Sequence, residues 1–135
     1  VKINTESVEI NHQKEHLILD KSKLNIGANK VEILFEAGET SLNRNKDFLY
    51  TLLVPDRAST LFPVFDQPDL KAKYNLQITA PKDWKVLAGG SLEKSTNIDG
   101  FTQHTFATTD LMSSYLFSFV AGKFSETTQN LLYKI

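Results

Sequence analysis

Two histidines and a glutamate near the start of the chain have the types and spacing of a zinc-peptidase signature. The stretch NHQKEH, residues 11–16, places His12, Glu15 and His16 in the pattern H-x-x-E-H. In peptidases with this pattern the two imidazoles bind zinc and the glutamate acts as the general base. The pattern raises the hypothesis of a zinc hydrolase. The secondary structure around these residues tests it.

A zinc site of this kind requires a helix. Helical periodicity brings side chains at i and i+4 onto one face, about 6 Å apart. Here the pattern lies between the strand-like segments SVEI and HLILD, and its polar residues are typical of a hairpin connection. On an extended chain the imidazoles of His12 and His16 would stand roughly 13 Å apart. The remaining histidine, His104, falls in a separate predicted strand. We therefore interpret the pattern as structural or fortuitous.

The elements around it are strands, because apolar and polar residues alternate with a period of two. In KVEILFEAG, residues 30–38, Val31, Ile33 and Phe35 share one face, and YNLQIT, residues 74–79, alternates in the same way. The stretch from Tyr115 to Val120 is apolar on both faces except at Ser118, which predicts a central strand. Shorter predicted strands are SVEI, HLILD, FLYTLLV, WKVLAG and FTQHTFAT. Residues 20–29 and 57–65 are each expected to hold a short helical turn.

These elements predict an all-β sandwich or curved sheet of about eight strands in a single domain covering residues 1–135. The chain is 41% hydrophobic, which suffices for a core, and its net charge is −1. That balance offers no basic surface for nucleic acid. No apolar run reaches the roughly 20 residues of a membrane-spanning helix. There is no Cys and no initiator Met, and we expect a fragment or a processed product.

Two blocks of sequence carry a resemblance to a known family. FPVFDQPDLKAKYNLQI, residues 62–78, and TTDLMSSYLFSFVAGKF, residues 108–124, follow one another about forty residues apart. Both resemble the N-terminal domain of the aminopeptidase N family of zinc metallopeptidases. The resemblance extends from about Phe48 to Phe124 and is looser before it. It implies a saddle-shaped β-sandwich of mostly antiparallel strands, in agreement with the alternation.

The first block has a structural interpretation. Pro63 and Pro68 exclude regular helix and central strand between them. Phe62 and Phe65 are expected to anchor the stretch in the core. The carboxylate of Asp66, which precedes Gln67, is expected to accept backbone N–H groups and stiffen the turn. As a general acid or base, Asp66 or Asp69 would need a partner at suitable spacing, and the sequence has none. Trp84 and the aromatic residues 115, 117 and 119 are expected to pack in the core or at a domain interface.

The resemblance also implies a parent enzyme. The family releases N-terminal residues from peptides with zinc held by an H-E-x-x-H helix and a later glutamate, and a Gly-x-Met-Glu-Asn strand binds the free amine. Neither motif occurs here, and the only methionine is Met112. We therefore expect no catalytic residue, metal ligand or cofactor in this chain, with zinc in the parent. The expected partners are the catalytic domain of the same polypeptide and a peptide substrate.

One contribution to substrate binding is implied by the resemblance. In related enzymes a Gln or Glu before the Phe-Pro pair lines the first specificity subsite and binds the substrate's amino terminus. Counting back nine residues from Pro63 reaches Val54, which has no oxygen acceptor in its side chain. Asp56 lies two residues further and is the substitute if the register shifts. Arg57 is expected to pair with Asp56 or to contact the catalytic domain.

Two functions of different classes therefore stand. The leading one is a non-catalytic N-terminal domain that walls the active-site cleft of a zinc aminopeptidase and docks its catalytic domain. The alternative is a free-standing β-sandwich module that binds carbohydrate or protein. Sugar-binding modules expose rows of aromatic side chains. Most aromatic residues here fall on strand faces expected to be buried, with Trp84 the main exception.

Overall fold

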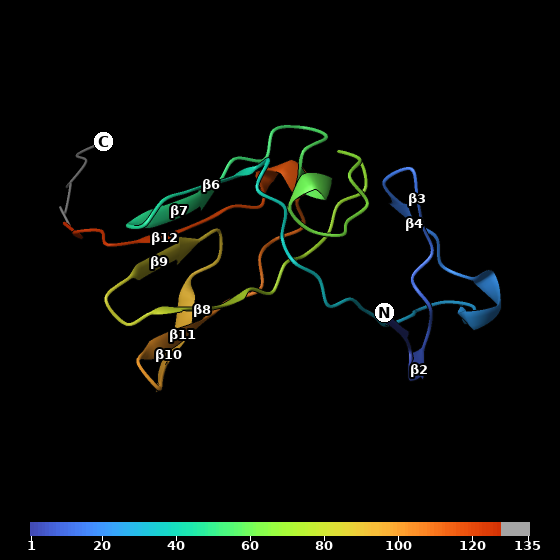
Figure 1. Ribbon diagram of the computed structural model, residues 1–135, viewed down its shortest axis with the longest axis horizontal. Helices are drawn as coiled ribbons and strands as arrows, with labels where there is room; N and C mark the ends of the chain where they lie inside the picture. Colours follow the sequence, from blue (N-terminus) through green and yellow to red (C-terminus); the bar gives the residue numbers. More distant parts are fainter. Residues whose placement is uncertain (128–135) are drawn as a thin grey trace, which may run out of the picture.

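The computed structural model describes residues 1–127, and their regular structure is almost entirely β (Figure 1). Every strand pair is antiparallel, which confirms the predicted fold class. The first 32 residues hold five strands of two residues each: β1 (Lys2–Ile3), β2 (Glu6–Ser7), β3 (His12–Gln13), β4 (His16–Leu17) and β5 (Val31–Glu32). The longer strands are β6 (Leu42–Arg44), β7 (Phe48–Thr51), β8 (Gln77–Pro81), β9 (Lys85–Ala88), β10 (Leu92–Ile98), β11 (Phe101–Phe106) and β12 (Phe119–Gly122).

Short helical turns appear where the sequence predicts them. The 3₁₀ turn η1 (Lys21–Lys23) lies within residues 20–29, and η2 (Ala58–Thr60) lies within residues 57–65. A third turn, η3 (Ser114–Leu116), precedes β12. Among residues 1–127 no helix has the length and apolar character needed to cross a membrane.

The longer strands form a sandwich of two sheets. One sheet has the order β6-β7-β12-β9 and the other β10-β11-β8. Side chains from both sheets meet in one buried cluster, with Ala80 from β8, Phe106 from β11, Val86 from β9 and Ala121 from β12. The connection from β8 to β9 carries the chain from one sheet to the other, and the N–H of Trp84 closes it on the carbonyl of Pro81 at 2.9 Å.

A second buried cluster lies where the loop after β7 meets η3. Its buried members are Leu53, Ala58, Leu61 and Phe117. The rings of Phe117 and Tyr74 stack with their centroids 4.6 Å apart, and aromatic pairs at this separation add to the stability of a core. This cluster attaches residues 53–61 firmly to the sandwich.

Two predictions from periodicity are confirmed. From Tyr74 to Thr79 the even-numbered residues are partly buried and the odd-numbered ones exposed. β12 lies centrally, between β7 and β9, as its apolar character on both faces predicts. The strand begins later than expected, because Ser114, Tyr115 and Leu116 form η3 instead.

The predicted strand over residues 30–38 is wrong for most of its length. Only Val31 and Glu32 pair, with β1. The side chain of Leu34 is 98% exposed and that of Phe35 is 49% exposed. Alternation indicates which face of a segment can be buried, but burial also needs a neighbouring strand. In the described chain β1 offers only two residues. Figure 1 shows β1 to β5 gathered at one end of the molecule, apart from the two larger sheets.

The strand β10 is not among the strands predicted from the sequence. Its seven residues are all exposed, so they carry no apolar alternation that could reveal a strand. The strand forms because it pairs with β11. The paired residues run from Ile98↔Phe101, beside the turn, to Leu92↔Phe106 at the other end. The turn between them is Asp99-Gly100, with φ of 41° and 84°. Two central residues with positive φ are typical of a tight hairpin, and Asp-Gly is a preferred pair there.

Candidate functional site

The H-x-x-E-H stretch is a β-hairpin, as its polar sequence predicts. β3 pairs with β4 through His12↔Leu17 and Gln13↔His16. The two turn residues, Lys14 and Glu15, both have positive φ, at 47° and 66°. Neighbouring residues of a strand point to opposite faces, so His12 shares a face with Leu17 and His16 lies on the other. The two imidazoles therefore project from opposite sides of the ribbon.

This hairpin does not fit a zinc ion. A zinc site needs three protein ligands converging on one point. Nδ1 of His16 instead lies 2.7 Å from the carbonyl oxygen of Lys14. No group of three or more His, Asp or Glu side chains in residues 1–127 is arranged to hold a metal. The donor set of the described chain is thus unsuited to the zinc of the enzymes that it resembles.

The subsite candidates form one exposed turn. Residues 54–57 make a β-turn in which the N–H of Arg57 donates to the carbonyl of Val54 at 3.1 Å. Asp56 has a φ of 67°, the position that requires a left-handed residue in a type II turn, and Pro55 precedes it as that type favours. The side chains of Val54, Asp56 and Arg57 are all exposed. Among the described residues Arg57 forms no ion pair with Asp56, contrary to one of the two expectations for it.

The Phe-Pro block has irregular backbone from residue 63 to residue 67. Its inward positions alternate: Phe62, Val64 and Asp66 are partly buried, while Pro63 and Phe65 are exposed. Phe65 is 79% exposed, so the prediction that it anchors the core is wrong. The period of two gives the inward place to Val64, which packs against the Phe117 cluster with Phe62. Gln67 and Pro68 lie at the exposed end of the block.

Asp66 joins two elements through its two carboxylate oxygens. Oδ2 accepts the backbone N–H of Ser59 in η2 at 2.9 Å. Oδ1 accepts the hydroxyl of Ser114 in η3 at 2.8 Å. Partial burial opposes the charged form of Asp66, but these hydrogen bonds outweigh it and hold the pKa of Asp66 below its usual value. Burial of the Tyr74 hydroxyl, and then the nearby charge of Asp66, raise the pKa of Tyr74.

Three further hydrogen bonds tie this loop together. The Thr60 hydroxyl donates to the carbonyl oxygen of Arg57 at 2.7 Å, and the hydroxyls of Thr60 and Ser41 lie 2.8 Å apart. On the other side, the Ser113 hydroxyl donates to the carbonyl of Pro68 at 2.5 Å. The exposed turn at residues 54–57 therefore continues directly into a braced η2. We call residues 54–60, the turn and η2 together, the braced turn.

Ser59, Thr60 and Ser114 are not among the site residues predicted from the sequence. A signal was present, because Asp66 and Ser114 belong to the two blocks that carry the family resemblance. Sequence alone cannot pair them: the two residues are 48 positions apart. Hydroxyl residues also bond many different partners.

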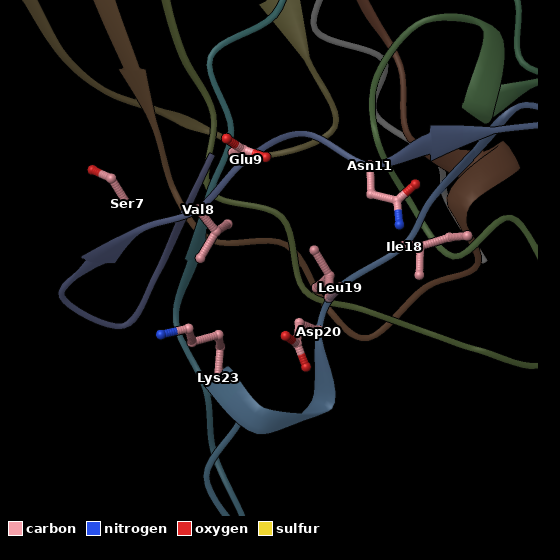
Figure 2. A pocket seen from close by; sticks show the side chains of 8 residues that line it. All are labelled: Ser7, Val8, Glu9, Asn11, Ile18, Leu19, Asp20 and Lys23. Carbon is pink, nitrogen blue, oxygen red and sulfur yellow. The ribbon is translucent and has the colours of Figure 1, made fainter.

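Two depressions lie away from the braced turn. The larger, of about 480 Å³, lies between β2 and η1, and Figure 2 shows its lining side chains. Two of its three charged side chains have partners: Asp20 accepts the N–H of Ser22 at the start of η1, and Lys23 pairs with Glu6 at 2.7 Å. The smaller, of about 300 Å³, lies against the outer face of β7, β9 and β12.

Comparison with known proteins gives the family. The profile of the peptidase M1 N-terminal domain matches residues 34–116, which include the first sequence block, the braced turn and the first part of the second block, residues 108–116. The chain belongs to the peptidase M1 N-terminal domain family. The earlier resemblance is thereby confirmed, and the M1 domain described above is a β-sandwich of that family.

Relatives of this M1 domain are aminopeptidases by name. It is 38% identical over 76 residues to glutamyl aminopeptidase of Sus scrofa, 30% over 94 residues to aminopeptidase 2 of Candida albicans, and 36% over 88 residues to aminopeptidase N of Acetobacter pasteurianus. These matches cover 56%, 69% and 64% of this chain. They cover only 8%, 10% and 23% of the respective relatives.

Proposed function

We propose that this chain is a single, non-catalytic N-terminal domain of a zinc-dependent aminopeptidase, and that it walls the active-site cleft and docks the catalytic domain. The observation that carries the proposal is the family match across residues 34–116 in a β-sandwich whose donor set does not fit zinc. Chemistry that depends on metal-bound water needs a metal site. The zinc and the catalytic groups then belong to another part of the same polypeptide.

We propose the exposed turn at residues 54–57 as the part of this domain nearest the substrate. Asp56 presents a carboxylate at the corner of the turn, and a carboxylate accepts hydrogen bonds from the ammonium group of a peptide's amino terminus. Val54, at the position counted from the Phe-Pro pair, supplies only apolar contact. Arg57 is free to contact the catalytic domain. The substrate is a peptide with a free amino terminus.

The test compares this chain with the complete polypeptide to which we assign it. Both are assayed for release of the arylamine from aminoacyl-arylamides, with and without a zinc chelator. We expect turnover by the complete polypeptide, loss of that turnover with the chelator, and none by the chain alone. Turnover by the chain alone, or a complete polypeptide without zinc after purification and dialysis, contradicts the proposal.

The subsite is tested separately by Asp56→Ala in the complete polypeptide. Loss of one charged acceptor for the substrate's ammonium group is expected to raise KM about tenfold and to change kcat less. Glu93→Ala, which removes an exposed carboxylate of β10, serves as the matched control. An unchanged KM in Asp56→Ala contradicts the role of this residue.

A further inference from the structure

The braced turn behaves as one unit because its parts share backbone groups. The carbonyl oxygen of Arg57, the last residue of the exposed turn, accepts both the hydroxyl of Thr60 at 2.7 Å and the N–H of Thr60 at 3.2 Å. Ala58 follows Arg57 and is completely buried in the Phe117 cluster. Arg57 precedes η2 but provides no side-chain cap for it. The position of η2 therefore determines the position of Val54, Asp56 and Arg57.

Besides Ser41, which contacts Thr60, a second side chain from outside the unit holds η2. The N–H of Ser59 lies in the first turn of η2, where no backbone acceptor within the helix is available. Oδ2 of Asp66 accepts it at 2.9 Å. The other oxygen, Oδ1, is held at 2.8 Å by Ser114, whose residue is 1% exposed. Asp66 thus connects η2 to the buried start of η3, and through η3 to the central strand β12.

We propose that Asp66 is a positioning residue: it fixes the braced turn against η3 and thereby sets how tightly the parent enzyme holds the amino terminus of its substrate. This inference rests on the proposed function. Asp66 does not touch the substrate. It acts through Ser59, three residues after Asp56. A displacement of about 1 Å in a substrate-positioning group can cost up to about a hundredfold in rate.

Four substitutions test the inference. Asp66→Ala removes both hydrogen bonds, and Ser114→Ala removes the anchor on η3. Asp66→Asn keeps the size and provides an oxygen for the N–H of Ser59 and an amide for the hydroxyl of Ser114. Asp69→Ala is the control, because Asp69 is exposed and its side chain makes no hydrogen bond or ion pair among the described residues.

The first measurement is independent of activity. In the 135-residue chain, the backbone amide resonances of Asp56 and Arg57 are recorded by NMR for each variant. We expect them to move in Asp66→Ala and Ser114→Ala, to move less in Asp66→Asn, and to stay in place in Asp69→Ala. Unmoved resonances in folded Ser114→Ala overturn the positioning role, even if Asp66→Ala fails to fold.

The second measurement uses the complete polypeptide and aminoacyl-arylamide substrates. We expect Asp66→Ala and Ser114→Ala to raise KM about tenfold with a smaller change in kcat, and Asp66→Asn to recover most of the loss. A merely structural role would lower the active fraction, and so kcat, at constant KM. That result overturns the inference. An inactive wild-type enzyme whose variants still shift the Asp56 resonance overturns the proposed function instead, and leaves Asp66 as the residue that fixes the turn.

Discussion

At the scale of single residues, the side chain of Asp66 shows how much depends on partners that are distant in sequence. Its oxygens bond Ser59, seven residues before it, and Ser114, 48 residues after it. Both bonds favour the carboxylate over the carboxylic acid, which is why its pKa lies below the usual value despite partial burial. A lowered pKa in the folded state means that ionised Asp66 stabilises the fold.

The pH dependence of stability follows from that shift. Because the folded pKa is the lower one, the stabilisation by Asp66 is complete above the unfolded value of about 4 and is lost as the pH falls through the folded value. Asp66→Asn cannot ionise. The difference in free energy of unfolding between wild type and Asp66→Asn should therefore be largest at pH 5–7 and shrink below pH 4. Urea unfolding at pH 7, 5 and 3 measures it. A difference that stays constant across this range contradicts the prediction.

At the scale of elements, the pairing of β12 with β7 depends on a close approach at one glycine. Gly122 pairs with Phe48 across the two strands. A Cβ built on Gly122 would lie 2.6 Å from Cβ of Phe48 and 2.8 Å from the carbonyl oxygen of Asp47. Backbone and Cβ atoms cannot move aside cheaply, so a side chain here forces the two strands apart.

Gly122→Ala is accordingly expected to destabilise the domain by about 1–3 kcal/mol, the usual cost of overpacking. Gly89→Ala is the matched control, because a Cβ at Gly89 meets nothing within 4 Å. Thermal or urea unfolding of both variants gives the comparison. Equal stability of Gly122→Ala and Gly89→Ala would show that β7 and β12 accommodate the methyl group without separating.

At the scale of the whole molecule, stability is unevenly distributed. The two buried clusters lie within residues 53–121, whereas in the first 35 residues Ile3 is the one fully buried apolar side chain. The strands β1 to β5 are two residues long, and apolar side chains near them, such as Leu34, are exposed. Few buried contacts and short ladders favour local opening.

Amide hydrogen exchange should show this division directly. The amides of β3, β4 and β5 are expected to exchange at nearly the rate of an unstructured peptide, because opening them exposes little apolar surface. Amides in β12 and β11, at the centres of their sheets, should exchange last. Comparable protection of β4 and β12 would indicate that the first 35 residues are stabilised by contacts absent from the described structure.

The sequence by itself determined the class of the fold. Alternation at residues 74–79 and the apolar character of Phe119 and Val120 on both faces specify strands through local side-chain chemistry. The Asp99-Gly100 pair specifies a tight turn for the same reason. Polar residues between two short strand-like segments likewise marked His12 to His16 as a hairpin. These features depend on neighbours along the chain, so the sequence contains them.

Only the tertiary structure decided which segments obtain a partner. The period of two in residues 30–38 is as clear as that in residues 74–79, yet one segment stays largely exposed and the other enters a sheet. Tertiary contacts also decided that Val64 rather than Phe65 is partly buried. They likewise decided which two groups form hydrogen bonds with Asp66. Burial and hydrogen bonding require a second surface, and whether one lies there depends on residues far away in sequence.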